Sequence, residues 1–222
     1  MNILEYENYQ ERKIHGDFEF PYNTYLCSIP LDFNQVPLHW HDEMEIINVV
    51  YGTAKYIVDF KEYIINEGDI LIIPPSSLHY FEQYNDNKFL GLTYIFDKKL
   101  VDGGSFDTCS TKYINPVFNN DIYLPIHIVA ESPHTETLKN ILDKIVINHD
   151  SHCVAYELQI KIGFLEFINY FYSIFFCLRL SNKFSFSITI FKIKFHFIYP
   201  LKTAILNLKD AVNYIELRSC KS

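Results

Sequence analysis

The sequence predicts a mainly β protein in which short, closely connected strands form a sandwich or barrel and α-helices follow. Between Tyr22 and Phe96, apolar residues alternate with polar ones in short runs separated by turn residues, which is the pattern of successive half-buried strands. After Pro133, apolar residues recur at helical spacing instead. The composition, with 49% apolar and 21% charged residues in a chain of 222, is that of a globular protein.

The strand region divides at glycine, proline and asparagine residues. Breaks are expected at Gly52, Glu67-Gly68, Pro74-Pro75 and Asn85–Asn87. Such close turns favour a sandwich or barrel over alternating strands and helices. The predicted strands are Asn23–Ile29, Met44–Tyr51, Ala54–Asp59, Tyr63–Ile65, Asp69–Ile73, Leu78–Tyr84 and Phe89–Phe96.

Two helices are predicted after the strands. The first covers Thr135–Asn148, with Thr135 as its N-cap. The second covers Ser151–Leu180, with an apolar stripe formed by Val154, Leu158, Leu165, Ile168 and Tyr172. Within it, Phe167–Leu178 is apolar nearly all round, but a membrane span needs roughly 20 apolar residues. We therefore predict a buried or dimer-forming helix and no membrane insertion.

Charge is distributed unevenly along the chain. The net charge of −8 argues against a protein that binds nucleic acid over its whole surface. From Phe175 to Ser222, however, eight Lys or Arg accompany only two acidic residues. Within this basic segment, Phe184–Tyr199 fits no regular element, while Leu201–Leu217 has helical spacing. An acidic front and a basic end predict two parts with different roles.

The first ten residues and the cysteines predict a cytoplasmic protein. The polar segment Met1–Gln10 has neither the basic start nor the apolar run of a secretory signal. The five cysteines are odd in number and contain no CxxC pair. This usage predicts reduced thiols rather than a disulfide framework.

The stretch PLHWHDEMEIINVVYG, residues 37–52, concentrates the chemistry-bearing side chains. His39, His41 and Glu45 are all odd-numbered, so an extended chain directs them to one face. His79 offers a fourth donor from a distant strand. Such a set can hold a divalent metal such as Zn, Fe, Mn or Ni. The alternative is a metal-free cluster of buried, hydrogen-bonded polar groups.

Two motifs resemble those of the cupin superfamily. HxHxxxE with Gly52 matches the first cupin motif, and GDILIIPPSSLHYFEQ, residues 68–83, is similar to the second. Ser76 stands where the second motif has glycine, and Gln83 where it has asparagine. The resemblance implies a double-stranded β-helix barrel, and it maps the four metal-ligand positions onto His39, His41, Glu45 and His79.

The sequence in and around these motifs is more specific than the general cupin pattern. PLHWHDEMEIINVVYGTAKYIVDF and EGDILIIPPSSLH look like the amino-terminal sensor domain of AraC-type bacterial transcription regulators. The resemblance covers residues 22–96 and extends more weakly to Leu178. It implies a barrel that binds a small effector, often a sugar, helices that form a dimer, and a carboxy-terminal DNA-binding domain.

Only the beginning of such a DNA-binding domain has a counterpart. LKDAVNYIE, Leu208–Glu216, is similar to its first helix, and no recognition helix follows. We therefore expect no specific DNA binding by this chain alone. The predicted organisation is an effector-binding barrel over residues 1–100, a loop and dimerisation helices over 101–180, and an aberrant linker with a stub of the DNA-binding domain over 181–222.

The function predicted is small-molecule sensing and dimerisation, without catalysis, as a homodimer or as a mixed dimer with a full-length relative. The effector would bind around His39, His41, Glu45 and His79. The alternative from another class is a metal-dependent cupin enzyme, an isomerase or dioxygenase acting on a small polar substrate. A third hypothesis, a remnant of an interrupted gene, rests on residues 184–199.

Overall fold

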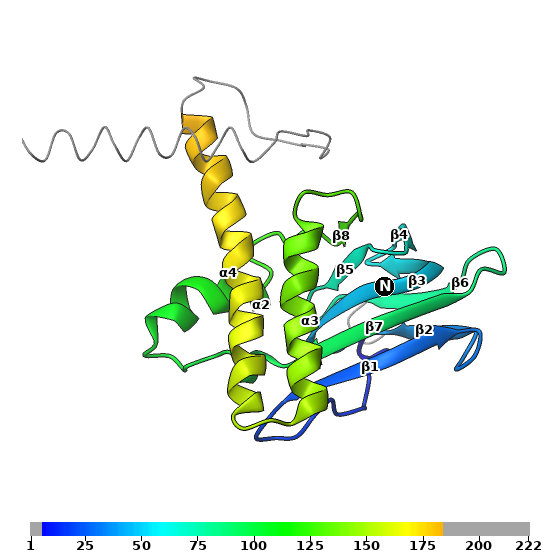
Figure 1. The fold of residues 1–222 in the computed structure, drawn as a ribbon, viewed down its shortest axis with the longest axis horizontal. Helices are drawn as coiled ribbons and strands as arrows, with labels where there is room; N and C mark the ends of the chain where they lie inside the picture. The colour runs from blue at the N-terminus through cyan, green and yellow to red at the C-terminus, as the bar shows by residue number, and fades with distance from the viewer. Residues whose placement is uncertain (1–5, 184–222) are drawn as a thin grey trace, which may run out of the picture. The chain divides into compact units, whose positions relative to one another are not determined.

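The chain folds into antiparallel β-sheets followed by helices, as the computed structural model shows for residues 6–183 (Figure 1). The predictions for 184–199, 201–217 and the DNA-binding stub lie outside the described residues. The strands are β1 (Tyr22–Ile29), β2 (Gln35–His39), β3 (Met44–Val58), β4 (Lys61–Asn66), β5 (Ile70–Ile73), β6 (His79–Gln83), β7 (Phe89–Phe96) and β8 (His127–Ile128). The helices are η1 (Lys98–Leu100), η2 (Ser110–Ile114), α2 (Asn115–Phe118), α3 (Thr135–Ser151) and α4 (Tyr156–Lys183).

Strand β3, 15 residues long, connects two layers of the sheet structure. Its first half pairs with β7 and β5, in the order β1-β7-β3-β5-β8. Its second half pairs with β4 and β6, and β6 in turn pairs with β2. Every one of these strand pairs is antiparallel. Because one strand belongs to both layers, the two layers form one sheet that bends around a shared apolar interior.

The predicted break at Gly52 is wrong, because β3 continues through it. A bulge between Val49 and Tyr51 shifts the register, and Gly52 adopts φ +79°. A Cβ at this position would lie 1.8 Å from the carbonyl oxygen of Lys88, so the close pairing with β7 requires glycine. The glycine therefore serves the strand pairing and does not end the strand.

The two faces of β3 lie in different cores. Even-numbered Met44 and Ile46 pack with the inner residues of α3 and α4 in one apolar cluster. Odd-numbered Ile47 and Val49 belong to a second cluster inside the barrel, with Tyr56 and other residues of both layers. This alternation is the period-2 geometry of a strand buried on both faces. Before the bulge it directs odd-numbered side chains into the barrel, and after the bulge it directs the even-numbered Ala54, Tyr56 and Val58 there.

Helices α3 and α4 lie across one face of the sheet (Figure 1). The proposed N-cap is wrong: His134 precedes the first helical residue, and Thr135 Oγ1 donates to the carbonyl oxygen of Val129 at 2.7 Å. The predicted stripe on α4 is also wrong in part, because Leu158 is 56% exposed. The buried face consists of Ile160, Gly163, Phe164, Phe167, Ile168 and Phe171.

The helices pack closely at one point. A Cβ on Gly163 of α4 would lie 2.4 Å from Cγ1 of Ile145 on α3, so the absence of a side chain sets the approach of the two helices. Among the residues the structure describes, no helix combines the length and apolarity needed to cross a membrane.

The architecture above belongs to the first of the two units into which the chain divides, Met1–Arg179, and α4 continues past it to Lys183. Its antiparallel strands, joined through β3 and followed by helices, confirm the predicted fold class: a mainly β, cupin-like barrel followed by α-helices.

Candidate functional site

The predicted donors converge at one end of the barrel. His39 ends β2 and lies directly opposite His79, the first residue of β6, with 4.1 Å between the ring centroids. Glu45 is the second residue of β3 and is on its inward-facing, odd-numbered side. His41 occupies the connection between β2 and β3. Three strands, β2, β6 and β3, and the connection between β2 and β3 thus deliver one side chain each to the same place.

The connection that carries His41 is fixed by the loop before β6. The backbone N–H of Ser76 donates to the carbonyl oxygen of His41 at 2.7 Å, and Ser76 Oγ donates to Asp42 Oδ1 at 2.9 Å. Ser76 has φ +60°, a left-handed conformation that glycine adopts most readily. This explains the glycine of the cupin motif, and serine keeps the conformation while adding the hydroxyl contact to Asp42.

In each imidazole, a contact with a backbone carbonyl shows which ring nitrogen carries a hydrogen. Nδ1 of His39 lies 2.8 Å from the carbonyl oxygen of Pro37, Nδ1 of His79 lies 2.8 Å from that of Ser77, and Nδ1 of His41 lies 3.2 Å from that of Glu43. Since a carbonyl only accepts, each Nδ1 carries a hydrogen. In the neutral rings the lone pair is therefore on Nε2.

The three histidines place ligand nitrogens within 4.8 Å of one another. Glu45 Oε2 lies 3.2 Å from Nε2 of His41 and 3.3 Å from Nε2 of His79. The first contact is a hydrogen bond, in which Nε2 of the charged, doubly protonated His41 ring donates to the carboxylate. The second lacks hydrogen-bond alignment and leaves the buried Nε2 of His79 without a partner. The carboxylate therefore touches two of the three imidazoles.

Burial and charge shape the protonation of this cluster. Burial alone would raise the pKa of Glu45, but the adjacent imidazoles of His41 and His79 hold that pKa far below its ordinary value. Burial likewise opposes the charged form of His41, yet Glu45 and other carboxylates raise the pKa of His41. For His39, burial and the neighbouring His79 lower the pKa. Glu45 is thus a buried anion that faces imidazole nitrogens.

The residues fit a divalent cation. A buried Nε2 with no hydrogen-bond partner is costly unless something binds it. The hydrogen bonds from Nδ1 to carbonyl oxygens are the outer contacts that orient metal-binding histidines. Three imidazoles and one carboxylate form a donor set typical of Zn, Fe, Mn or Ni. The four residues are therefore suitable ligands.

Two residues that were not predicted also lie beside the histidines. Glu11 Oε2 is 3.9 Å from Nε2 of His39 and 3.1 Å from Nε2 of His15. The His15 ring lies 5.7 Å from that of His41. Their segment has no apolar periodicity, and the one local signal, Glu11 and His15 four residues apart, is weak. Sequence patterns could not place this polar segment at the barrel.

Solvent reaches the cluster on the His39 side. The His39 side chain is 17% exposed, compared with 4% for His41, 2% for His79 and 8% for Glu45. Farther inside, the barrel is filled by apolar side chains, among which Tyr56 and Phe81 stack with ring centroids 4.4 Å apart. A bound molecule therefore has access to the histidines from outside the packed interior.

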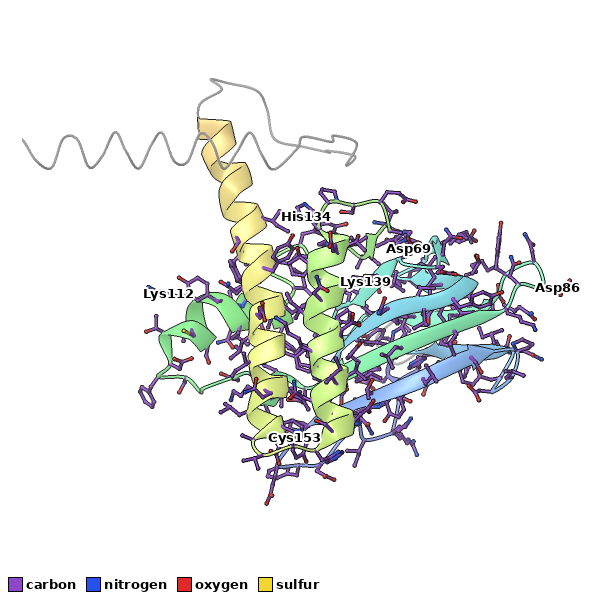
Figure 2. The ribbon with its side chains drawn as sticks, in the orientation of Figure 1. Asp69, Asp86, Lys112, His134, Lys139 and Cys153 are labelled. Atoms are coloured by element: carbon purple, nitrogen blue, oxygen red, sulfur yellow. The ribbon has the colours of Figure 1, made fainter. Side chains whose placement is uncertain are left out.

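A second polar cluster lies near the start of α3 and has a structural role. Asp69, labelled with His134 in Figure 2, accepts hydrogen bonds from His127 Nε2 at 2.8 Å and from the backbone N–H groups of Asn66 and Ala130. Although burial opposes it, the bond from His127 and the two backbone bonds lower the pKa of Asp69. These bonds tie the β4–β5 turn to the segment that leads into α3.

The sequence and the fold match known proteins. Residues 32–166 match the family described as AraC-like ligand binding domain. An uncharacterized HTH-type transcriptional regulator from Bacillus subtilis is 31% identical over 83 residues, which cover 37% of this chain and 28% of that protein. The chain thus aligns with little more than a quarter of this relative.

Two solved structures are similar to part of the chain. A cupin protein from Bacteroides fragilis is 19% identical and covers 39% of this chain and 75% of its own, with a TM-score of 0.34. A Cupin 2 conserved barrel domain protein from Salinispora arenicola is 24% identical and covers 35% of this chain and 64% of its own, with a TM-score of 0.31.

A cupin-like barrel with a histidine-rich end, followed by packed helices, defines a class of small-molecule-binding domains. The family match extends over most of the described residues, from before β2 into α4. This chain belongs to the AraC-like ligand-binding domains, and the resemblance predicted from its two motifs is confirmed.

Proposed function

We propose that this domain senses a small molecule for an AraC-type transcription regulator and binds its effector at the histidine end of the barrel. The observation that carries the proposal is the convergence of His39, His41 and His79, with ligand nitrogens within 4.8 Å of one another beside the buried Glu45. The family of ligand-binding domains supports the same role. The proposed effector carries oxygen donors, and sugars are one such class.

The proposed site is organised around a divalent cation held by His39, His41, His79 and Glu45. A bound cation would supply a Lewis-acidic centre for the oxygen atoms of an effector. The protein's own contribution is orientation: carbonyl oxygens fix the imidazoles, and the bulky interior confines the effector to the solvent-accessible side at His39. This arrangement accounts for the three buried polar side chains His41, Glu45 and His79, which lie beside the partly exposed His39 next to an apolar interior.

Dimerisation is proposed for the helical part. The barrel, residues 1–100, would bind the effector in the cytoplasm, and residues 101–180 would form the contact with a second copy or a full-length relative. On α4, Leu158 and Ile162 are 56% and 45% exposed and lie one turn apart on the side away from the buried face. Exposed apolar residues in such a row support a helix contact.

The metal content of the purified protein tests the site. We expect about one equivalent of divalent metal in the wild type, loss of that metal in the double variant His39→Ala/His79→Ala, and retention in His152→Asn. The control removes an exposed imidazole, and asparagine tolerates the left-handed conformation of that position. Equal metal content in the double variant and the wild type would contradict the proposed ligand set.

A second candidate function is catalysis by a metal-dependent cupin enzyme. The observation that favours it is the donor set itself, three imidazoles and one carboxylate, which also suits a catalytic metal. Metal-loaded protein incubated with panels of sugars and small aromatic compounds separates the two functions. Saturable binding without consumption of the compound supports the sensor, whereas turnover that is lost in His39→Ala/His79→Ala supports the enzyme.

A further inference from the structure

The segment before β1 is attached to the chain between the two leading histidines. The backbone N–H of Glu11 donates to the carbonyl oxygen of Trp40 at 2.9 Å, and the N–H of Trp40 donates to that of Tyr9 at 3.0 Å. Tyr6 stacks on the Trp40 indole with 4.6 Å between ring centroids. Because Trp40 stands between His39 and His41, this pairing sets Glu11 beside the histidine site.

A directed chain of hydrogen bonds orients the Glu11 carboxylate. Asn23 Oδ1 accepts from the backbone N–H of Thr24, so its Nδ2 donates to Tyr25 Oη at 3.2 Å. The tyrosine hydroxyl can then donate to Nδ1 of His15 at 3.0 Å, and Nε2 of His15 donates to Glu11 Oε2 at 3.1 Å. His15 is only 4% exposed. The carboxylate is thus held from behind by a buried imidazole.

The oriented oxygen faces a proposed metal ligand. Glu11 Oε2 lies 3.9 Å from Nε2 of His39. Nitrogen and oxygen ligands bind such cations at about 2.0–2.2 Å, so two donors that share one cation lie no more than about 4.2 Å apart. The separation is too long for a hydrogen bond and places Glu11 within reach of an ion at His39. Because only His39, His41 and His79, within the described part of the chain, bring their ligand atoms within 4.8 Å of one another, Glu11 must turn toward them to share that ion. Glu11 also lies on the side of the cluster where His39 is exposed to solvent.

We propose that Glu11 is a further ligand of the cation site and that His15 is its positioning residue. The inference rests on the proposed function, because it requires a cation at the histidines. It assigns the segment before β1 to the binding site, and it changes the donor set to three imidazoles and two carboxylates. Two carboxylates neutralise the charge of a divalent ion, which favours its retention in a partly buried site.

The test is the binding of Co²⁺ to the full chain, followed by competition with a chelator and by the visible absorption of the bound ion. We expect Glu11→Gln to weaken Co²⁺ binding at least about tenfold and to change the absorption bands, which depend on the ligand set. Glu7→Gln is the matched control: it removes the same charge from the same segment at an exposed position, and we expect wild-type affinity and spectrum.

The outcomes separate this inference from the proposed function. If the wild type binds no Co²⁺, the proposed cation site fails and the inference fails with it. If the wild type and Glu11→Gln bind equally tightly with identical spectra, Glu11 is no ligand although the histidine site stands. A similar loss in Glu7→Gln would assign the effect to general charge and would also overturn the inference. Equal melting temperatures of the metal-free proteins verify that Glu11→Gln folds.

Discussion

Local backbone contacts determine how the site histidines present their nitrogens. His39 and His79 each direct Nδ1 to a carbonyl oxygen two residues earlier, at Pro37 and Ser77. The identity of the four residues was predictable from the two motifs. The extended chain expected from His39 to Glu45 is interrupted, because β2 ends at His39, β3 begins at Met44 and His41 lies between them. The tautomers were not predictable, because they depend on hydrogen bonds to backbone carbonyls, which the residue types of a motif do not reveal. Glu11 was not predictable either, since a tertiary pairing with Trp40 brings it to the site.

Asp69 makes the free energy of unfolding depend on pH in the acidic range. Its pKa is lowered in the folded state, so its contribution is complete above the ordinary carboxyl pKa of about 3.9 and is lost as the pH falls toward the lowered value. We expect Asp69→Asn to reduce the free energy of unfolding by about 1–3 kcal/mol at pH 6. The deficit should shrink at pH 3. Urea unfolding at both pH values measures it.

The comparison between the two pH values is decisive for Asp69. An equal deficit at pH 6 and pH 3 would mean that the ionised carboxylate contributes nothing beyond a neutral acceptor. Asp86→Asn serves as the control, because this residue lies at the tip of the β6–β7 turn (Figure 2), where its side chain is exposed. Exposed carboxylates contribute little, so we expect a change within about 0.5 kcal/mol.

At the level of the secondary-structure elements, α3 and α4 pack closely because Gly163 has no side chain. In an exposed helix, Gly→Ala would stabilise by about 1 kcal/mol. At Gly163 we expect the opposite, a net loss of about 1 kcal/mol or more, because the new Cβ would meet Cγ1 of the fully buried Ile145. Thermal or urea unfolding of Gly163→Ala measures this loss.

A double-mutant cycle assigns the loss to this one contact. Ile145→Ala removes Cγ1, so adding Gly163→Ala to it should cost nothing or should stabilise the protein. The cycle should therefore show a coupling of about 1–2 kcal/mol. Additive effects of the two substitutions would show that some other part of the α3–α4 contact is responsible.

The prediction of dimerisation rests on the exposed apolar residues on the outer side of α4. We expect the double variant Leu158→Glu/Ile162→Glu to be monomeric where the wild type is dimeric, because charged groups cannot be buried unpaired in a helix contact. Sedimentation equilibrium measures the association. Leu31→Glu, at an 87% exposed position after β1, is the control and should leave the dimer intact. A wild type that stays monomeric at high concentration would refute this role of the helix.

How well each element was predicted depended on the length of its pattern. Strands β1 and β7 and helix α3 have sustained periodicity and were predicted within a few residues. Strand β2 was missed because Pro37 interrupts a stretch of five residues, and β8 because it contains only two. The start of α4 and its buried face were misjudged because apolar residues occur on several sides of this helix, and only packing against α3 selects one.

For the molecule as a whole, strand β3 links the proposed binding site to the helices. Its residues alternate between the barrel interior, where Glu45 lies, and the cluster shared with α3 and α4, where Met44 and Ile46 lie. Neighbouring residues of one strand therefore touch the donor cluster and the helical layer. No pattern in the sequence revealed this sharing, because the hydrophobic runs are the same whichever face receives the helices.

Because the proposed cation site is assembled from β2, β3, β6 and the connection that carries His41, its donors come together only in the folded barrel. Binding to the folded state alone stabilises it by about 2.7 kcal/mol when free metal is at a hundred times the dissociation constant. We therefore expect Zn²⁺ to raise the melting temperature of the metal-free chain by about 5–10 °C, and a chelator to reverse the increase.

The variants show whether this stabilisation arises at the predicted donors. In His39→Ala/His79→Ala the melting temperature should not respond to Zn²⁺, whereas His152→Asn should respond like the wild type. The metal-free double variant need not lose stability, because it also loses a buried nitrogen that has no hydrogen-bond partner. An equal response to Zn²⁺ in the double variant would place the ion elsewhere on the chain. A response confined to proteins with both histidines would tie the stability of the whole barrel to the occupancy of its site.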